Sequence, residues 1–242
     1  MSNADNYEAA ASGASTTVAS FEDTNKGFIG QFQHALHVNP AIVPLIVLVS
    51  AIIIFGLVLG SKCFSPFALT LILQQVQIVG VLAAAQALII LTAGIDLSVG
   101  AVAVLCTVIM GQVSFRYGIP APASVAIGLA AGTAIGAVNG WLVSKIKLPP
   151  FIVTLGMWQI VLAVNYLYAN NETIRSQEIA AEAPLLQLFG EKVTIGGAVF
   201  TYGVIFLVIL VSVLAYVLRH TAYGRHVYAV GDDPEAAELS GV

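Results

Sequence analysis

The sequence predicts an all-α fold, a polytopic membrane helix bundle with about six transmembrane helices and a broken helix near Asp96. Of its 242 residues, 58% are hydrophobic and 9% are charged, and the mean hydropathy is +0.92. Soluble domains carry roughly 25% charged residues, so this composition indicates a protein surrounded mostly by lipid. Several apolar runs also reach the roughly 20 residues that a helix needs to cross a bilayer. These spans should be helices, because an open strand leaves its backbone unsatisfied in lipid.

The composition and the motif content exclude several function classes. The net charge of -4 is small, and no cluster of Lys and Arg marks a nucleic-acid partner. Cys63 and Cys106 form neither a disulfide framework nor a metal-binding spacing. The sequence also lacks the phosphate-loop, H-E-x-x-H, C-x-x-C and G-x-S-x-G patterns. We therefore expect no catalytic residue, no metal site and no cofactor in this chain, and any energy for transport must come from an ion gradient or a partner.

Residues 1–39 are expected to form a cytoplasmic tail. The first 20 are rich in Ala, Ser, Thr and Asn and have neither the basic start nor the apolar core of a signal peptide. The stretch "GFIGQFQHALH" that follows repeats apolar residues at helical spacing. It is either a short helix on the membrane surface or a plain connector.

The membrane region is expected to cover residues 40–218. The predicted spans are 41–60, 67–92, 96–114, 122–144, 150–169 and 199–218. Lys145 and Lys147 follow the fourth span, and Arg219 and Arg225 follow the sixth, which places these ends and the N-terminus in the cytoplasm. Lys26 agrees with this orientation, whereas Lys62 and Arg116 fall on the outer side. Residues 170–198 then form an external loop with room for a surface helix.

Polar side chains inside the spans are the candidates for a substrate pathway. An amide that faces hydrocarbon without a partner costs several kcal/mol, so these residues should face protein or water. Two explanations stay open, namely hydrogen bonds between helices and a polar route for hydroxylated solutes. The candidates are Gln74, Gln75, Gln77, Gln86, Asp96, Ser98, Asn139, Gln159 and Asn165.

The fourth span has a small residue at every fourth position. The series is Ser124, Gly128, Gly132, Gly136, Gly140 and Ser144. This extended small-xxx-small pattern predicts a helix that packs with its backbone close to a neighbour.

Asp96 lies in "LTAGIDLSVG" and is the only carboxylate between Asp23 and Glu172. A charge inside the membrane costs at least a few kcal/mol unless it is neutralised, capped or hydrated. The flanking Gly94 and Ser98 suggest a break in the helix, with Asp96 or Ser98 as N-cap of the next helical segment. The alternative is a direct role in transport, since broken helices at membrane depth are buried or line a cavity.

The polar residues 219–242 follow the last span. Asp233 is placed as an N-cap, Pro234 at the first helical position and Gly241 as a stop signal for a short helix over 235–240. Such a helix on the cytoplasmic face is either a docking element or an ordinary solvated turn.

Three motifs in this order carry a resemblance to a known family. "LTAGIDLSVGAV", "VNGWLVSKIKLPPFIVTLGMW" and "GRHVYAVGDDPEAAELSGV" closely resemble the membrane permeases of bacterial ABC importers for ribose, xylose, arabinose and fructose, most of all the fructose-type members. The similarity runs from about residue 40 to the C-terminus. It implies an inner-membrane permease that pairs as two copies and takes sugar from a periplasmic binding protein. A cytoplasmic ATPase that binds ATP and Mg would drive it.

Within this resemblance, the C-terminal segment looks like the motif that couples the permease to its ATPase. The residues that match this motif are Gly224, Arg225, Asp233, Glu235, Ala236, Ala237 and Gly241. Family chains continue past it with further spans, whereas this sequence ends at Val242, so we expect a fragment or a truncated chain.

Two other function classes stay open beside the ATPase-driven importer. An ion-coupled secondary transporter or channel would use Asp96 as its ion or proton site and would need no ATPase. A membrane scaffold would have all its glutamines satisfied within the bundle. The importer is preferred, because the coupling-like segment and the external loop supply both of the contacts that it needs.

Overall fold

The computed structural model describes residues 27, 34, 36–39, 41–195 and 198–241. The chain divides into two compact units, residues 1–63 and 64–242. The first unit contributes helix α3 (Ile42–Leu59) and the short 3-10 turn η1 (Gly60–Lys62). Most of the expected tail and surface helix lies outside the described residues.

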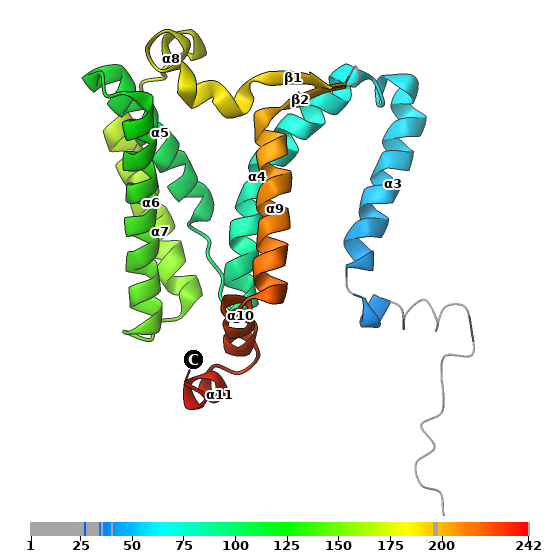
Figure 1. Ribbon diagram of the computed structural model, residues 1–242, viewed down its shortest axis with the longest axis vertical. Coiled ribbons are helices and arrows are strands. Elements are labelled where there is room, and N and C mark those ends of the chain that lie inside the picture. Colours follow the sequence, from blue (N-terminus) through cyan, green and yellow to red (C-terminus); the bar gives the residue numbers. More distant parts are fainter. Residues whose placement is uncertain (1–26, 28–33, 35, 40, 196–197, 242) are drawn as a thin grey trace, which may run out of the picture. The chain divides into compact units, whose positions relative to one another are not determined.

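The described residues contain six helices that are long and apolar enough to cross a membrane, which confirms the expected number (Figure 1). They are α3, α4 (Pro66–Leu91), α5 (Val99–Tyr117), α6 (Ala121–Ser144), α7 (Pro150–Ala169) and α9 (Tyr202–His220). The fold is mostly helical, as predicted.

Local signals in the sequence set several helix ends. Ser65 caps α4, since its Oγ accepts a hydrogen bond from the Ala68 amide at 3.2 Å, and Pro66 takes the first helical position. Gly118 ends α5 in the left-handed conformation, with φ of 62°. Asn170 ends α7 in the same conformation, with φ of 50°. After Gly118, residues 119 and 120 lead directly into α6, so the connection between α5 and α6 is short.

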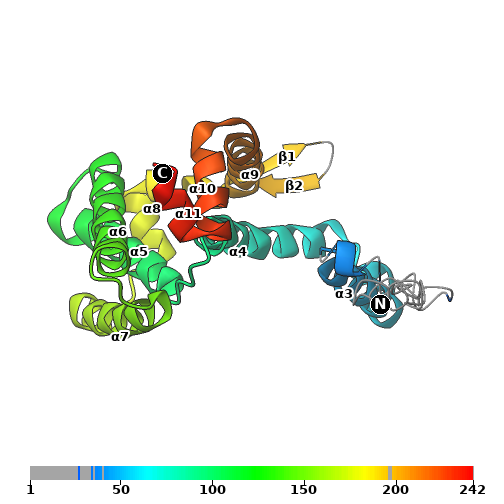
Figure 2. The same ribbon diagram turned by 90° about the horizontal axis from the view of Figure 1, so that it is seen from below.

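The second unit packs its spans in two groups. Helix α5 contacts both α6 and α7 (Figure 2). A small core in this group consists of Ala101, Leu105 and Val161. Helix α4 packs along α9. Little of each span is buried within the chain, only 6% of the α4 window for example. The remaining apolar surface is therefore free for lipid or for neighbouring proteins.

The small residues of α6 lie in two different environments. An added Cβ at Gly128 would come within 2.6 Å of Met110 and 3.1 Å of the Cys106 carbonyl oxygen, both on α5. At Gly132 an added Cβ would lie 2.8 Å from Cys106 Sγ. Nothing in the described residues lies within 4 Å of the corresponding position at Gly136 or Gly140. Within this series of small residues, which we call the small-residue stripe, the first half packs closely on α5 and the second half is exposed.

The loop expected over 170–198 holds the short helix for which it had room, α8 (Ser176–Glu182). It also holds structure that was not predicted, namely the 3-10 helix η2 (Pro184–Gly190) and strand β1 (Lys192–Ile195), which pairs with β2 (Ala198–Thr201) in an antiparallel hairpin. The all-α expectation missed this hairpin, and the sixth span begins at Tyr202 rather than 199. The reason is the run of β-branched and aromatic residues on both sides of Gly196-Gly197, a pattern that favours two paired strands.

Two elements mark the opposite ends of α4. Near its start, Thr70 Oγ1 donates a hydrogen bond to the Val199 carbonyl of β2 at 3.1 Å. At its end, α10 (Ala222–Asp232) approaches so closely that a Cβ at Gly231 would lie 1.9 Å from the Leu91 carbonyl oxygen. The 26 residues of α4 span roughly 39 Å, more than the hydrocarbon core of about 30 Å. The hairpin and α10 therefore lie on opposite faces of the membrane.

The contrast within the stripe gives a first prediction. Gly128→Leu should destabilise the protein by about 1–3 kcal/mol, because the new side chain overpacks the contact with α5. Gly136→Leu, the matched control, adds the same side chain to an exposed position and should cost far less. Thermal unfolding in detergent measures both. An equal loss of stability in the two variants would contradict the assignment of the packed half.

Candidate functional site

The chain between α4 and α5 is not helical over residues 92–98, which confirms the predicted break near Asp96. Ala93 adopts a left-handed conformation with φ of 57°, which is unfavourable for a residue with a Cβ. Gly94 follows in a tight place, where a Cβ would lie 3.0 Å from Ile89 Cγ2 and 3.2 Å from the Ile89 carbonyl oxygen. The last turn of α4 and this bend therefore require a small residue at 94.

Asp96 lies two residues before Ser98, the N-cap of α5, and fixes the start of this helix. Its Oδ1 accepts hydrogen bonds from the Ser98 amide at 2.7 Å and from Ser98 Oγ at 2.6 Å. Ser98 occupies the N-cap position of α5, but its side chain accepts no amide of the first turn. Of the two predicted N-caps, Ser98 occupies the N-cap position. The Asp96 carboxylate orients Ser98 and does not itself accept an amide of the first helical turn.

Three neighbouring helices hold this bend by hydrogen bonds. Asn139 Nδ2 of α6 donates to Ser98 Oγ at 3.1 Å, and Thr154 Oγ1 of α7 donates to the Ile95 carbonyl at 3.2 Å. The Gln86 amide of α4, oriented so that both of its polar atoms are satisfied, donates to the Asp96 carbonyl at 3.1 Å and accepts from the Asp96 amide at 3.3 Å. We call the residues that make these bonds the polar clamp: Gln86, Ile95, Asp96, Ser98, Asn139 and Thr154.

The polar clamp lies near the membrane face that carries α10. Asn139 is five residues before the end of α6, and Thr154 is four residues after the start of α7. At 1.5 Å per residue, both are within about 8 Å of the connection between these helices. Ser98 is fully buried, with 0% of its surface exposed. Asp96 is therefore satisfied close to the membrane boundary rather than at the bilayer centre.

The other pathway candidates lie away from the clamp. Gln77 Oε1 accepts a hydrogen bond from Thr201 Oγ1, which ties α4 to the start of α9. Gln75 and Gln159 are exposed, and Gln74 is half-buried. The structure thus brings Gln86, Asp96, Ser98 and Asn139 together and places Gln77 at the hairpin.

Some buried amide oxygens have no hydrogen-bond partner among the described residues. They are Asn139 Oδ1, Asn165 Oδ1 and Gln112 Oε1. Asn139 and Asn165 are sequence candidates, whereas Gln112 of α5 and Thr154 of the clamp were missed. The available signal for both was a lone polar residue within an apolar span. An unpaired buried acceptor costs about 1–3 kcal/mol, so these atoms can accept a hydrogen bond from a ligand or a solvent molecule.

The C-terminal residues form two helices rather than one. Helix α11 (Pro234–Leu239) begins as predicted, with Asp233 Oδ1 accepting from the amides of Glu235 at 3.0 Å and Ala236 at 3.1 Å. It is followed by Gly241, whose φ is 81°. The preceding helix α10 was not expected, because "AYGRHVYAVGD" contains two glycines and two valines, which are poor helix formers.

The matched coupling residues divide into buried and exposed positions. Gly224 is buried in the first turn of α10, where a Cβ would lie 2.1 Å from the Leu218 carbonyl oxygen of α9. Ala237 is buried as well. Exposed positions are Arg225, Asp233, Glu235, Ala236 and Gly241, together with Leu239, of which 90% is exposed. The exposed side of α10 and α11 therefore combines apolar and charged residues, whereas Gly224 and Ala237 pack against the rest of the chain.

Comparison with known proteins adds a family and several relatives. Residues 68–242 match a family described as the permease component of branched-chain amino acid transport systems. Over 236 residues the chain is 61% identical to the fructose import permease protein FrcC of Rhizobium meliloti, an alignment that covers 98% of this chain and 66% of the relative. It is 34% identical over 199 residues to the ribose import permease protein RbsC of Escherichia coli K12, covering 81% and 60%.

A third relative is the autoinducer 2 import system permease protein LsrC of Photorhabdus luminescens, 32% identical over 197 residues that cover 81% of this chain and 57% of the relative. No solved structure matches the chain. The chain thus spans between 57% and 66% of the length of these relatives.

The hydrogen bonds of Asp96 give a second prediction. Asp96→Ala removes the acceptor for the Ser98 amide and hydroxyl and should destabilise the protein by about 1–3 kcal/mol. Asp96→Asn keeps an oxygen in the same place and should lose less than half as much. Thermal unfolding of the two variants in the same detergent tests this. If Asn is as damaging as Ala, the charge rather than the acceptor matters.

Proposed function

The chain belongs to the family of permease components of branched-chain amino acid transport systems, and from this membership we propose that it is the transmembrane permease of an ATP-binding-cassette importer for a monosaccharide. The observation that carries the proposal is the 61% identity to a fructose import permease over 98% of the chain. Fructose or a similar sugar is the proposed cargo, because two of the relatives are import permeases for sugars. The chain is a non-catalytic subunit of the bacterial inner membrane, and a separate ATPase binds ATP and Mg.

We propose that α10 and α11 dock on that ATPase at the cytoplasmic face. Their exposed surface combines Arg225 and Glu235 with Ala236 and Leu239, so it offers charge and apolar area together. The contact of Gly231 with Leu91 holds α10 against α4, and the Asp233 cap fixes the start of α11, which packs on α10. A docking element must be rigid if movement of the ATPase is to reach the spans, and this arrangement supports that role.

The remaining partners follow from the same orientation. We assign the end that carries α8 and the hairpin to the periplasm, where a sugar-binding protein delivers its cargo, and the N-terminus to the cytoplasm. A second permease copy is expected to cover part of the apolar surface that the chain leaves exposed, and lipid covers the rest.

Alternating access supplies the proposed mechanism, in which ATP binding and hydrolysis favour different conformations of the permease. The proposed sugar contacts are the free acceptors Asn139 Oδ1 and Asn165 Oδ1, which suit sugar hydroxyls as donors. Gln74, Gln75 and Gln159 are proposed as further pathway residues. Gln77, Gln86, Asp96 and Ser98 are assigned a positioning role, since each is engaged by partners within the chain.

The competing ion-coupled mechanism requires Asp96 to bind an ion or a proton. Its Oδ1 already accepts two short hydrogen bonds, an environment that supports a structural carboxylate.

Reconstitution tests the proposed function directly. Liposomes that contain the permease, its ATPase and the sugar-binding protein should take up labelled fructose only when ATP is present, and Asp96→Asn should keep most of this uptake. Liposomes without the ATPase serve as the control under an imposed proton or sodium gradient. Gradient-driven uptake without ATPase, abolished by Asp96→Asn, would falsify the importer and support the ion-coupled alternative.

Charge reversal on α11 tests the docking surface. Glu235→Lys should weaken co-purification of the ATPase about tenfold or more, because an exposed charge at the contact changes sign. Insertion of the permease into the membrane should stay the same. Glu182→Lys in α8, the same change on the opposite membrane face, is the matched control. Equal ATPase recovery with both variants would remove α11 from the contact.

A further inference from the structure

A cavity of about 440 Å³ lies between the outer half of α5 and the external segment, by which we mean residues 171–190. One wall comes from α5 and includes Thr107, Met110 and Gln112, and the opposite wall includes Ile174 and Ile179 of the external segment. Its volume falls in the range of about 300–1,000 Å³ that is typical of small-molecule sites. The clamp and the sequence-predicted pathway residues take no part in this cavity.

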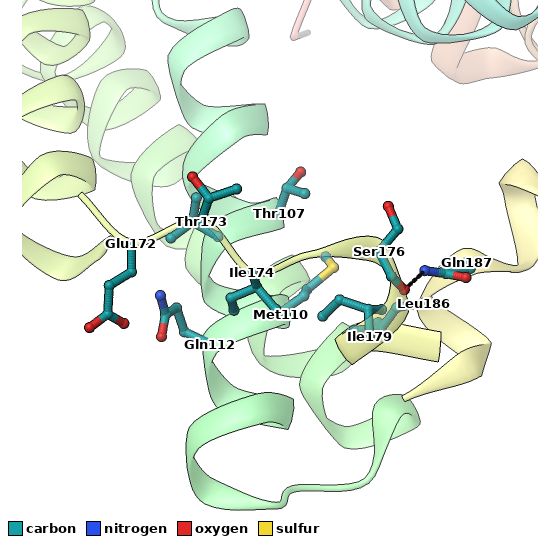
Figure 3. Close-up of a pocket in the computed structure, with 12 residues that line it drawn as sticks. Thr107, Met110, Gln112, Glu172, Thr173, Ile174, Ser176, Ile179, Leu186 and Gln187 are labelled. Carbon is teal, nitrogen blue, oxygen red and sulfur yellow. Dashed lines mark hydrogen bonds between the residues drawn. The ribbon is translucent and has the colours of Figure 1, made fainter. Parts of the chain in front are cut away.

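Gln112 gives this cavity a chemical preference. Only 2% of its surface is exposed, and its Oε1 has no hydrogen-bond partner among the described residues. A buried acceptor without a partner is unfavourable for the folded protein, so a protein keeps one where a ligand or water completes it. Figure 3 shows Gln112 beside Glu172 at one end of the cavity, with Met110 and Ile174 toward its centre.

The other lining groups are polar but almost without charge. Hydroxyls come from Thr107, Thr173 and Ser176, and a second amide from Gln187. The charged residue among the described lining is Glu172, and its carboxylate is paired with Arg116 at the end of α5. A free phosphate or carboxylate would find no cation here, and a cation would find no free carboxylate. The lining therefore suits a neutral ligand that carries several hydroxyl groups.

The external segment is fixed over the cavity by specific contacts. The ion pair of Glu172 with Arg116 joins it to α5, and Gln187 Nε2 donates to the Ser176 carbonyl at 2.6 Å, which ties η2 to α8 (Figure 3). Phe189 of η2 packs against Phe206 of α9 in a tilted arrangement, with ring centroids 5.1 Å apart. The external segment is thus supported by both groups of spans.

We propose that this cavity is an outer binding site for a monosaccharide within the permease, in which the Gln112 amide bonds sugar hydroxyls and Met110, Ile174 and Ile179 pack against the carbon face of the ring. The inference rests on the proposed function, because that function supplies a sugar on this side of the membrane. The site receives the sugar on the periplasmic face before it reaches the acceptors at Asn139 and Asn165. A lipid chain is the poorer occupant, since it would leave Gln112 and the hydroxyls unpaired.

Equilibrium binding of labelled D-fructose and D-ribose to the full permease in lipid nanodiscs, without ATPase or binding protein, tests the site. Wild type should bind one of these sugars saturably, and Gln112→Leu should weaken that affinity tenfold or more. Gln177→Leu is the matched control, since it makes the same change at an exposed position of α8 that does not line the cavity. The affinity of Gln177→Leu for the sugar should equal that of the wild type.

Folding of the variant is checked independently of binding. The melting temperature of sugar-free Gln112→Leu should equal or exceed that of wild type, because the change removes an unpaired buried acceptor. Gly111→Leu provides a second probe that alters no polar group: a Cβ at this position lies at ordinary contact distance, 3.6 Å from Ile174 Cδ1, and the rest of the side chain fills the cavity. It should abolish sugar binding as well.

The results separate this site from the proposed function. Unchanged affinity in Gln112→Leu overturns the site. Native mass spectrometry that finds a retained lipid and no sugar overturns it too. If neither sugar binds the isolated wild type while the reconstituted importer still takes up fructose, the outer site is wrong and the proposed function stands.

Discussion

The bend between α4 and α5 has to satisfy its backbone away from water, and the structure depends on how it does so. A non-helical connection between two spans leaves amides and carbonyls that cost several kcal/mol each when they are buried without a partner. Asp96 pairs the amide and hydroxyl of Ser98, while Gln86, Asn139 and Thr154 approach from α4, α6 and α7. This set of bonds joins the α4 and α9 pair to the α5, α6 and α7 group, so the relation between the two groups follows from it.

The two ends of α4 carry different structures, and the bend connects α4 to α5. At one end of α4, the hairpin contacts α4, and the external segment lies over α5 and encloses the cavity at Gln112. At the other end, α10 packs on the last turn of α4 and carries α11 outward. A rearrangement at the bend would move α5 relative to α4 and therefore change both ends together. This is the property that alternating access driven from one face requires.

Features that depend on local composition were predictable from the sequence, and features that depend on distant contacts were not. Spans follow from hydropathy in a single window, and the Asp233-Pro234 start of α11 follows from adjacent residues. Gly128 and Gly136 have the same local pattern, yet only Gly128 meets α5, because packing depends on the partner helix. Helix α10 forms despite weak propensity since it docks on α4. The cavity at Gln112 needs a segment 60 residues further along the chain, which no local pattern reveals.

Hydrogen–deuterium exchange of residues 92–98 in lipid nanodiscs measures the clamp most directly. The account predicts that the amides of Asp96 and Ser98 exchange at least about a hundredfold more slowly than free loop amides, and that Asp96→Ala removes the protection at Ser98. Asp96→Asn should retain most of it. Exchange of both amides at the rate of an unprotected loop in the wild-type protein would contradict the account, since the bend would then lack the bonds that hold the two groups of helices together.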